Sequence, residues 1–380
     1  MRVLHTSDLH LGRQFNGIPL DEDHDRVLNQ IVRAIVTHRA DVLVIAGDIF
    51  DRAAPPATAV RQFNSFLSRV ASETTAAVVM IAGNHDSGDR IASMSIMTDA
   101  NRALIRGVVA VDERPLVLVD EHGAVAFSGL PFSYEYAARE CFADEGIQAP
   151  EDVLAAQVAA ARGNIPKDAR WVIVAHAFVS GAQGSDSERP LARVGGIETV
   201  RPEIFEGAHY VALGHLHRPQ SAGAPHIRYS GSPLAFGFDE ADSTKSMNLV
   251  EIDGEGNVRV ETIPFAPIRG VRILRGKHSE LLLAEPSADF VKAVLTDEVP
   301  IIDGMKRLRE VFQNACDLTY ERDERAPEVK SFDARVTKVA DPIIVIGDFL
   351  ELVRNDRMTD EDLKVVASAL HDIRNGEGAA

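Results

Sequence analysis

Short polar strings at the ends of apolar runs constrain this chain more than any other feature of its 380 residues. Four of them follow runs rich in β-branched and aliphatic residues: Asp8-Leu9-His10, Gly47-Asp48-Ile49-Phe50-Asp51, Gly83-Asn84-His85-Asp86 and Gly214-His215-Leu216-His217. A fifth such run ends at His176. Continuous apolar runs are typical of buried strands, and the loops after strands often carry functional groups. The pattern therefore predicts carboxylate, amide and imidazole side chains just past strand ends, which indicates a metal site.

A pair of divalent cations explains this choice of residue types. Two cations held about 3.5–4 Å apart require a bridging anion and a mixed oxygen and nitrogen shell. Asp48 is the natural bridge, because a carboxylate can bind two metals through its two oxygens whereas an imidazole offers one lone pair. Thiolates are absent from the strings, which argues against a closed structural zinc site. The ligands suit manganese, iron, zinc or magnesium, and the several imidazoles disfavour magnesium alone.

A structural interpretation competes with this one for each string taken alone. A single histidine after a strand is more often a packed or hydrogen-bonded residue than a ligand. Four strings and His176, all at strand ends, are hard to assemble by chance, and packing gives no reason for Gly-Asn-His-Asp at a strand end. We therefore interpret the strings together as a metal site.

The strings resemble those of the calcineurin-like metallophosphoesterase superfamily and, within it, those of the bacterial SbcD nuclease subunits of the Mre11 family. The narrower resemblance rests on three segments: 1–12 (MRVLHTSDLHLG), 47–51 (GDIFD) and 229–236 (YSGSPLAF). It covers nearly the whole chain.

The resemblance implies a role for each site residue. Two sets of four ligands share one aspartate: Asp8, His10, Asp48 and His217 for one metal, and Asp48, Asn84, His176 and His215 for the other. His85 would be a catalytic histidine that binds no metal and stabilises or protonates the leaving oxygen, with Asp86 orienting it. Archaeal and eukaryotic relatives place a histidine where this chain has Asp51, so the role of Asp51 is open.

The order of the apolar runs predicts an α/β fold. Strands are expected near 2–6, 42–46, 77–81, 171–175 and 210–213, and helices near 23–38 and 57–71. Alternating runs at 116–130 and 227–264 indicate further antiparallel strands, with turns at Gly123 and at Asp253-Gly254. We expect a mixed double β-sheet sandwich flanked by helices, the metallophosphoesterase architecture that the resemblance also implies, over residues 1–268.

A small α/β capping domain for DNA is expected over residues 269–328. Its strands lie near 271–275, 290–295 and 318–321, with a helix near 303–316 between the last two. Lys306, Arg307 and Arg309 give this helix a basic side, which is either a solvated face or a phosphate contact. The loop at 182–193 is either a solvated connection or a substrate flap.

Residues 329–380 are expected to end the chain in two amphipathic helices. One begins at Asp341-Pro342 and the other at Thr359, where Thr359 and Asp362 have the spacing of a capping box. These helices either pack on their own domain or dock on a partner. The chain has no P-loop string, so any ATP dependence must come from a partner. The resemblance implies the coiled-coil root of an SbcC-like SMC-type ATPase subunit.

The net charge of −17 suits a DNA-binding protein poorly, because binding to the phosphate backbone normally draws on lysine and arginine. In the resembled family, DNA is gripped by a homodimer within a heterotetramer that includes the ATPase. Cys141 and Cys316 are too few for a disulfide framework and are expected to be packed thiols. No run approaches the roughly 18 apolar residues of a membrane span and no leader precedes the first strand, so we expect a cytoplasmic location.

The expected function is that of a manganese-dependent DNA nuclease, a 3′–5′ exonuclease and endonuclease that hydrolyses phosphodiesters with two metals. By resemblance it would process DNA ends and hairpins within an SbcCD-type complex. One alternative is a free-standing phosphatase or cyclic-nucleotide phosphodiesterase, which the capping domain and terminal helices fit poorly. Another is a non-catalytic scaffold, against which the retained ligand positions and His85 count.

Overall fold

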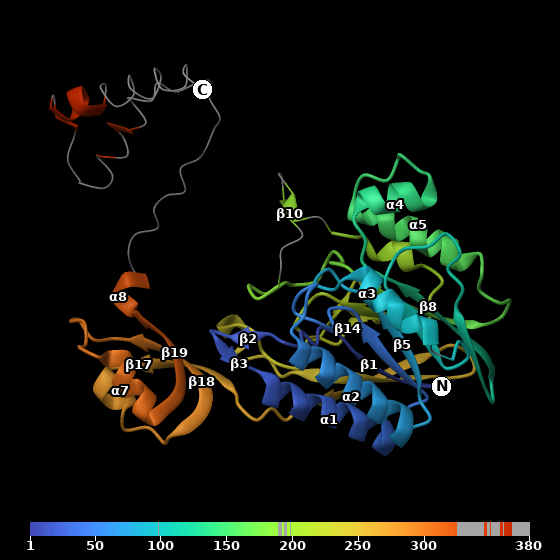
Figure 1. Ribbon diagram of the computed structural model, residues 1–380, viewed down its shortest axis with the longest axis horizontal. Coiled ribbons are helices and arrows are strands. Elements are labelled where there is room, and N and C mark those ends of the chain that lie inside the picture. The colour runs from blue at the N-terminus through green and yellow to red at the C-terminus, as the bar shows by residue number, and fades with distance from the viewer. Residues whose placement is uncertain are drawn as a thin grey trace. The chain divides into compact units, whose positions relative to one another are not determined.

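Figure 1 shows a computed structural model of the chain. The structure describes residues 1–97, 99–188, 192–193, 196–197, 199–324, 346–347, 350, 358–359 and 361–366. Contacts divide the chain into one compact unit from Met1 to Glu321 and a second from Arg322 to Ala380. The two helices expected after Asp341 lie mostly outside the described residues. Their packing and the proposed boundary at 268/269 stay predictions.

The first of two large sheets has six strands in the order β16-β15-β1-β4-β5-β6. They are β1 (Arg2–Thr6), β4 (Val42–Ala46), β5 (Ala77–Ile81), β6 (Ala103–Arg106), β15 (Ser246–Ile252) and β16 (Val258–Pro264). β1, β4, β5 and β6 are parallel, while β15 pairs antiparallel with β1 and β16 with β15. Every residue of β4 is buried, as expected of a strand covered on both faces.

The second large sheet has the order β13-β14-β12-β9-β8-β7. Its strands are β7 (Leu116–Asp120), β8 (Gly123–Leu130), β9 (Arg170–His176), β12 (Tyr210–Gly214), β13 (Gln220–Ala222) and β14 (Ala224–Tyr229). β8 and β14 were expected to be antiparallel, but each is antiparallel only to its hairpin partner and parallel to a central strand. A short turn forces the antiparallel pairing, whereas longer connections allow the parallel one.

The two sheets face each other and carry helices on their outer sides (Figure 1). Side chains of both inner faces, such as Val44, Val79 and Val172, form one buried cluster. On the outer face of the first sheet, α1 (Asp21–His38) and α2 (Ala57–Glu73) pack through residues such as Ile31 and Phe63. On the second sheet, α5 (Pro150–Arg162) packs through Leu154 and Val158. The predicted α/β double-sheet sandwich is confirmed.

Shorter elements complete the described part of this region. They are β2 (Gln14–Phe15), β3 (Ile18–Pro19), α3 (Gly88–Ser93), α4 (Glu135–Phe142), β10 (Ala192–Arg193), β11 (Gly196–Ile197) and the 3-10 turns Met94–Met97, Pro202–Phe205 and Phe238–Glu240. The sequence reading did not predict α4 and α5. Cys141 and Cys316 are free thiols of intermediate exposure. Among the described residues, no helix is both long and apolar enough to cross a membrane.

The expected capping domain is a three-stranded parallel sheet with short helices. Its elements are β17 (Val271–Gly276), α6 (His278–Leu281), β18 (Ser287–Leu295), α7 (Gly304–Val311), β19 (Phe312–Tyr320) and the turn of helix α8 (Glu321–Glu324) that follows. The helix predicted at 303–316 is wrong in its second half, because Phe312 to Cys316 belong to β19. Phe312 and Ala315 are buried in the cluster between β18, β19 and α7. These residues therefore form a strand that pairs with β18, although their apolar spacing also fits a helix.

Candidate metal centre

The carboxyl ends of five strands bring the predicted ligands together. Asp8, Asp48 and Asn84 follow β1, β4 and β5 of the first sheet. His176 ends β9, and His215 and His217 follow β12 of the second sheet. His10 lies two residues after Asp8, and all seven side chains are buried. Parallel strands present their carboxyl ends at one edge, so the topology gathers residues that lie far apart in sequence.

The backbone at this edge is strained. Asp8, His10, Asp48 and His215 adopt φ values of 53°, 45°, 49° and 104°. Non-glycine residues rarely occupy this left-handed region, and each such residue costs about 1–3 kcal/mol. Four strained residues among seven predicted ligands indicate that the fold sacrifices stability to aim these side chains, which is typical of functional sites.

Two glycines in the strings allow the loops to approach. A Cβ atom on Gly83 would overlap the backbone nitrogen and the carboxylate of Asp48, and one on Gly214 would overlap the carbonyl oxygen of Ala46. Gly83 is therefore required by the close approach of the loops after β4 and β5 of the first sheet, and Gly214 by the close approach of the two sheets.

One group of donor atoms surrounds Asn84. Its Oδ1 atom lies 2.9 Å from His176 Nε2 and 3.1 Å from His215 Nδ1. His176 Nε2 lies 3.5 Å from Asp48 Oδ2. Ligands at about 2.1 Å from a common cation are separated by about 3.0 Å at 90° and about 3.4 Å at 109°. The spacing therefore fits one coordination shell, to which His215 would contribute Nδ1 and His176 would contribute Nε2.

A second group of donor atoms surrounds His10. Its Nε2 atom lies 3.2 Å from His217 Nε2 and 3.6 Å from Asp48 Oδ2. One ligand atom each of Asp8, His10 and His217 lies within 4.8 Å of the others. Two buried ring nitrogens that face each other at this distance suit a cation between them, because a cation accepts both lone pairs. The His/Asp/Asn donors thus fit two cations.

Asp48 joins the two groups differently from the sequence-based expectation. Its Oδ1 atom accepts the backbone N–H of His85 at 2.8 Å. Its Oδ2 atom alone faces the imidazoles, at 3.5 Å from His176, 3.6 Å from His10 and 3.9 Å from His85. Oδ2 is therefore the Asp48 oxygen that would hold metal, because Oδ1 already accepts a hydrogen bond.

Burial and mutual charge set the protonation of the site. Burial raises the pKa of Asp8 to about 6. Burial opposes ionisation of Asp48 too, but the charge and hydrogen bond of His176 outweigh it and lower its pKa. The same pairing outweighs burial at His176 and raises its pKa to about 9. Burial lowers the pKa of His215 to about 3 and that of His10 well below its usual value, so both offer neutral imidazoles, the form that binds metals.

His85 lies beside the two groups. Its Nδ1–H donates to the carbonyl oxygen of Asp51 at 2.8 Å, which leaves Nε2 turned toward Asp48. The Asp86 carboxylate accepts the backbone N–H groups of Gly83, Ile49 and Phe50 at 2.9–3.1 Å, and no hydrogen bond joins it to the His85 ring. The ring is thus oriented by Asp51, whereas Asp86 ties the two loops together.

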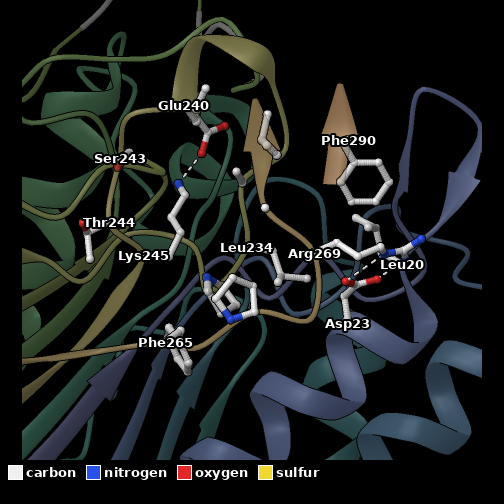
Figure 2. Close-up of a pocket in the computed structure, with 16 residues that line it drawn as sticks. Leu20, Asp23, Leu234, Glu240, Ser243, Thr244, Lys245, Phe265, Arg269 and Phe290 are labelled. Carbon is white, nitrogen blue, oxygen red and sulfur yellow. Dashed lines mark hydrogen bonds and ion pairs between the residues drawn. The ribbon is translucent and has the colours of Figure 1, made fainter. Parts of the chain in front are cut away.

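Hydrogen bonds behind His217 involve residues that the sequence reading missed. Ser187 Oγ lies 2.7 Å from His217 Nδ1 and donates to the Glu240 carboxylate. Glu240 also pairs with Lys245, as Figure 2 shows, and both are buried. Because a carboxylate only accepts, the Ser187 hydroxyl accepts from His217 Nδ1–H, and the Nε2 lone pair faces the candidate centre. The only sequence signal for these hydrogen bonds is the high proportion of charged residues at 239–245.

The described part of the predicted flap is anchored at the site. Glu188 accepts the backbone N–H of His217 at 2.6 Å, and Arg13 donates to the Ser187 carbonyl oxygen at 2.9 Å. A cleft of about 610 Å³ opens here, and it is lined by Arg13, Gln14, Asn16, Gly17, Asp51, Arg52, His85, Ser187 and Glu188. His85 and the flap residues therefore border the space through which a substrate would reach the donor groups.

Comparison with known proteins gives the family of the chain. The family model of the calcineurin-like phosphoesterases matches residues 1–219. The chain belongs to this family. This phosphoesterase is also similar to the SbcD subunit of the SbcCD nuclease of Staphylococcus epidermidis, with 28% identity over 97% of this chain and 96% of the relative. A Thermus thermophilus protein of known crystal structure overlaps with a TM-score of 0.39 and 13% identity, covering 69% of this chain and 98% of that one.

The family and the clustered histidines and aspartates agree that the phosphoesterase has a site suited to two metals. The ligand assignments themselves are proposals, as is the metal. When bound, two divalent cations would supply Lewis acidity and an activated water for attack at phosphorus.

Proposed function

We propose that this phosphoesterase is a manganese-dependent DNA nuclease with 3′–5′ exonuclease and endonuclease activity. The observation that carries the proposal is the pair of donor groups that share Asp48 Oδ2, with His85 beside them at the border of an open cleft. The likeness along 97% of the chain to the SbcD subunit of an SbcCD nuclease supports DNA as the substrate. Magnesium, iron and zinc are the alternative metals.

His85 and Arg13 have complementary roles in this proposal. His85 Nδ1–H is fixed on the Asp51 carbonyl oxygen, so a protonated His85 would donate from Nε2 to the leaving oxygen of the substrate. The Arg13 guanidinium lies 3.7 Å from the Asp51 carboxylate and lines the cleft, where it can bind a phosphate oxygen. We assign Asp86 to positioning of the loops, since its carboxylate contacts three backbone N–H groups.

The proposal includes assembly with other chains. An SbcC-like SMC-type ATPase would bind the C-terminal helices, and a homodimer within a heterotetramer would hold the DNA in the cytoplasm to process its ends and hairpins. The exposed side chains of Lys306, Arg307 and Arg309 on α7 would then face DNA phosphates. This arrangement would offset the repulsion that a chain with net charge −17 exerts on DNA.

One substrate panel tests the function. Purified protein with manganese is incubated with linear duplex DNA, bis-nitrophenyl phosphate and cyclic nucleotides, with a metal-free sample as the control. We expect manganese-dependent cleavage of DNA and of the model diester. Cleavage of cyclic nucleotides with intact DNA would support the small-substrate alternative, and no hydrolysis of any diester would contradict the nuclease proposal.

A further inference from the structure

Two exposed tyrosines form a nearly parallel ring pair in the segment that follows β8. The side chains of Tyr134 and Tyr136 are 52% and 65% exposed. Their ring centroids lie 5.8 Å apart with an angle of 11° between the planes. Phe132 contacts Tyr134 edge to face, at 5.1 Å and 85°. Large aromatic groups left in water as a cluster usually mark a binding surface.

The ring pair is connected to the site by the backbone of β8. This strand ends at Leu130, and the N–H of Phe132 then donates to the carbonyl oxygen of Ala82 at 3.0 Å. Ala82 lies two residues before the proposed ligand Asn84. Phe132 also lines a small cavity together with His176. The row Phe132, Tyr134, Tyr136 therefore leads from the donor groups to the protein surface at the start of α4.

We propose that Tyr134 and Tyr136 form a stacking platform for unpaired nucleobases of the substrate strand. This inference rests on the proposed function, and it names the part of the substrate that the platform holds. Aromatic side chains stack on bases of any sequence, because every base has a π-face. In a duplex this face is covered by the neighbouring bases, so the base must first be unstacked. The platform therefore selects single-stranded or frayed DNA.

The ring spacing specifies how a base binds. Inserting a base between two rings needs about 6.8 Å, twice the 3.4 Å stacking distance of DNA. The tyrosines are 5.8 Å apart, so a base stacks on an outer ring face and does not enter between the rings. Stacking also needs no positive charge. It is therefore a mode of DNA binding open to a chain with net charge −17.

The test measures binding without cleavage. Full-length metal-free protein is titrated into fluorescent oligothymidylate, and into an abasic oligomer of equal length that keeps the phosphates but lacks the bases. We expect binding of oligothymidylate to fall roughly 5- to 150-fold for each tyrosine replaced by alanine. Tyr134→Phe and Tyr136→Phe keep the rings and should stay within about twofold of wild type. Val119→Ala removes an exposed apolar side chain on β7 and serves as the matched control.

Several outcomes would overturn the platform. One is that wild type and the Tyr134→Ala/Tyr136→Ala double variant bind oligothymidylate with the same affinity. Another is that wild type binds the abasic oligomer as tightly as oligothymidylate. A third is that the phenylalanine variants lose as much affinity as the alanine variants. If the alanine variants bind oligothymidylate as wild type does but no longer bind the ATPase partner, the two tyrosines form a protein contact instead. Tyr136→Ala alone, at the more exposed ring, decides the matter if the double variant fails to fold. Wild type that binds the oligomer but hydrolyses neither DNA nor bis-nitrophenyl phosphate would overturn the proposed function and leave the platform standing.

Discussion

Replacement of Lys245 by methionine should strongly destabilise the protein, although Lys245 is not a proposed ligand. Its Nζ pairs with Glu240 and donates to the His217 carbonyl oxygen at 2.8 Å and to Ser232 Oγ at 3.1 Å. The Lys245 side chain is 7% exposed and that of Glu240 is 0% exposed. Removal of one partner leaves a buried carboxylate without its counter-charge, which typically costs about 3–5 kcal/mol.

The same change should weaken one metal site. Burial alone would raise the pKa of Glu240, but the neighbouring His217, at 3.5 Å, and the charge of Lys245 lower it to about 2. Without Lys245, Glu240 is easier to protonate and orients His217 less firmly through Ser187. We expect manganese affinity to fall about 10- to 100-fold, the usual effect of losing a residue that orients a metal ligand.

Urea unfolding of the metal-free protein measures the first effect, and manganese titration measures the second. The Glu240→Gln/Lys245→Met double variant removes both charges and should recover most of the lost stability. Arg201→Met serves as the control, since Arg201 is 72% exposed in its pair with Glu151 and should cost about 1 kcal/mol or less. A loss below about 1 kcal/mol for Lys245→Met would refute the reasoning.

Three other changes test separate parts of the account. His85→Gln should keep both metals and lower DNA cleavage by at least about 100-fold; loss of one metal equivalent, or a wild-type rate, would contradict its role. Deletion of the chain after Asp341 should preserve manganese-dependent hydrolysis of bis-nitrophenyl phosphate and abolish capture by a coiled-coil fragment of the ATPase, and unchanged capture would refute docking. Burial raises the pKa of Glu113 from 4.5 to about 7, against the opposing charge of Arg106. Its proton thus stabilises the fold fully below pH 4.5, and this contribution is lost as the pH rises through 7. Glu113→Gln should therefore raise the melting temperature relative to wild type at pH 8 but not at pH 4.5, and equal shifts at both would contradict this.

The positions of the site residues could be predicted because strand ends are visible in sequence. Apolar runs before Asp8, Asp48 and Asn84 mark buried parallel strands of one sheet, whose carboxyl ends lie at the same edge. Which ring nitrogen of His215 and which oxygen of Asp48 face the other donor atoms depends on loop geometry at the scale of a single bond. Spacing along the chain carries no information about either.

Two causes explain what could not be predicted from the sequence: contacts between distant loops, and apolar spacing that fits both a helix and a strand. Ser187 and Glu240 are 53 residues apart, and nothing in either segment indicates that they share a hydrogen bond. Leu308, Phe312 and Ala315 have a spacing that also fits one face of a helix, so spacing alone does not exclude a helix that continues to 316. Pairing of β19 with β18 decides the matter, and that pairing is a tertiary contact.

The manganese content of wild type and Asp48→Asn tests the central claim most directly. Asn keeps the size of the side chain but removes the charge that both donor groups share, and Asp51→Asn, at a carboxylate outside both proposed ligand sets, is the matched control. After equilibrium dialysis against manganese and elemental analysis, we predict two equivalents in wild type and in Asp51→Asn, and loss of both in Asp48→Asn. Loss of a single equivalent in Asp48→Asn would show that Asp48 binds one metal only, and would contradict the account of a two-metal centre joined by this residue.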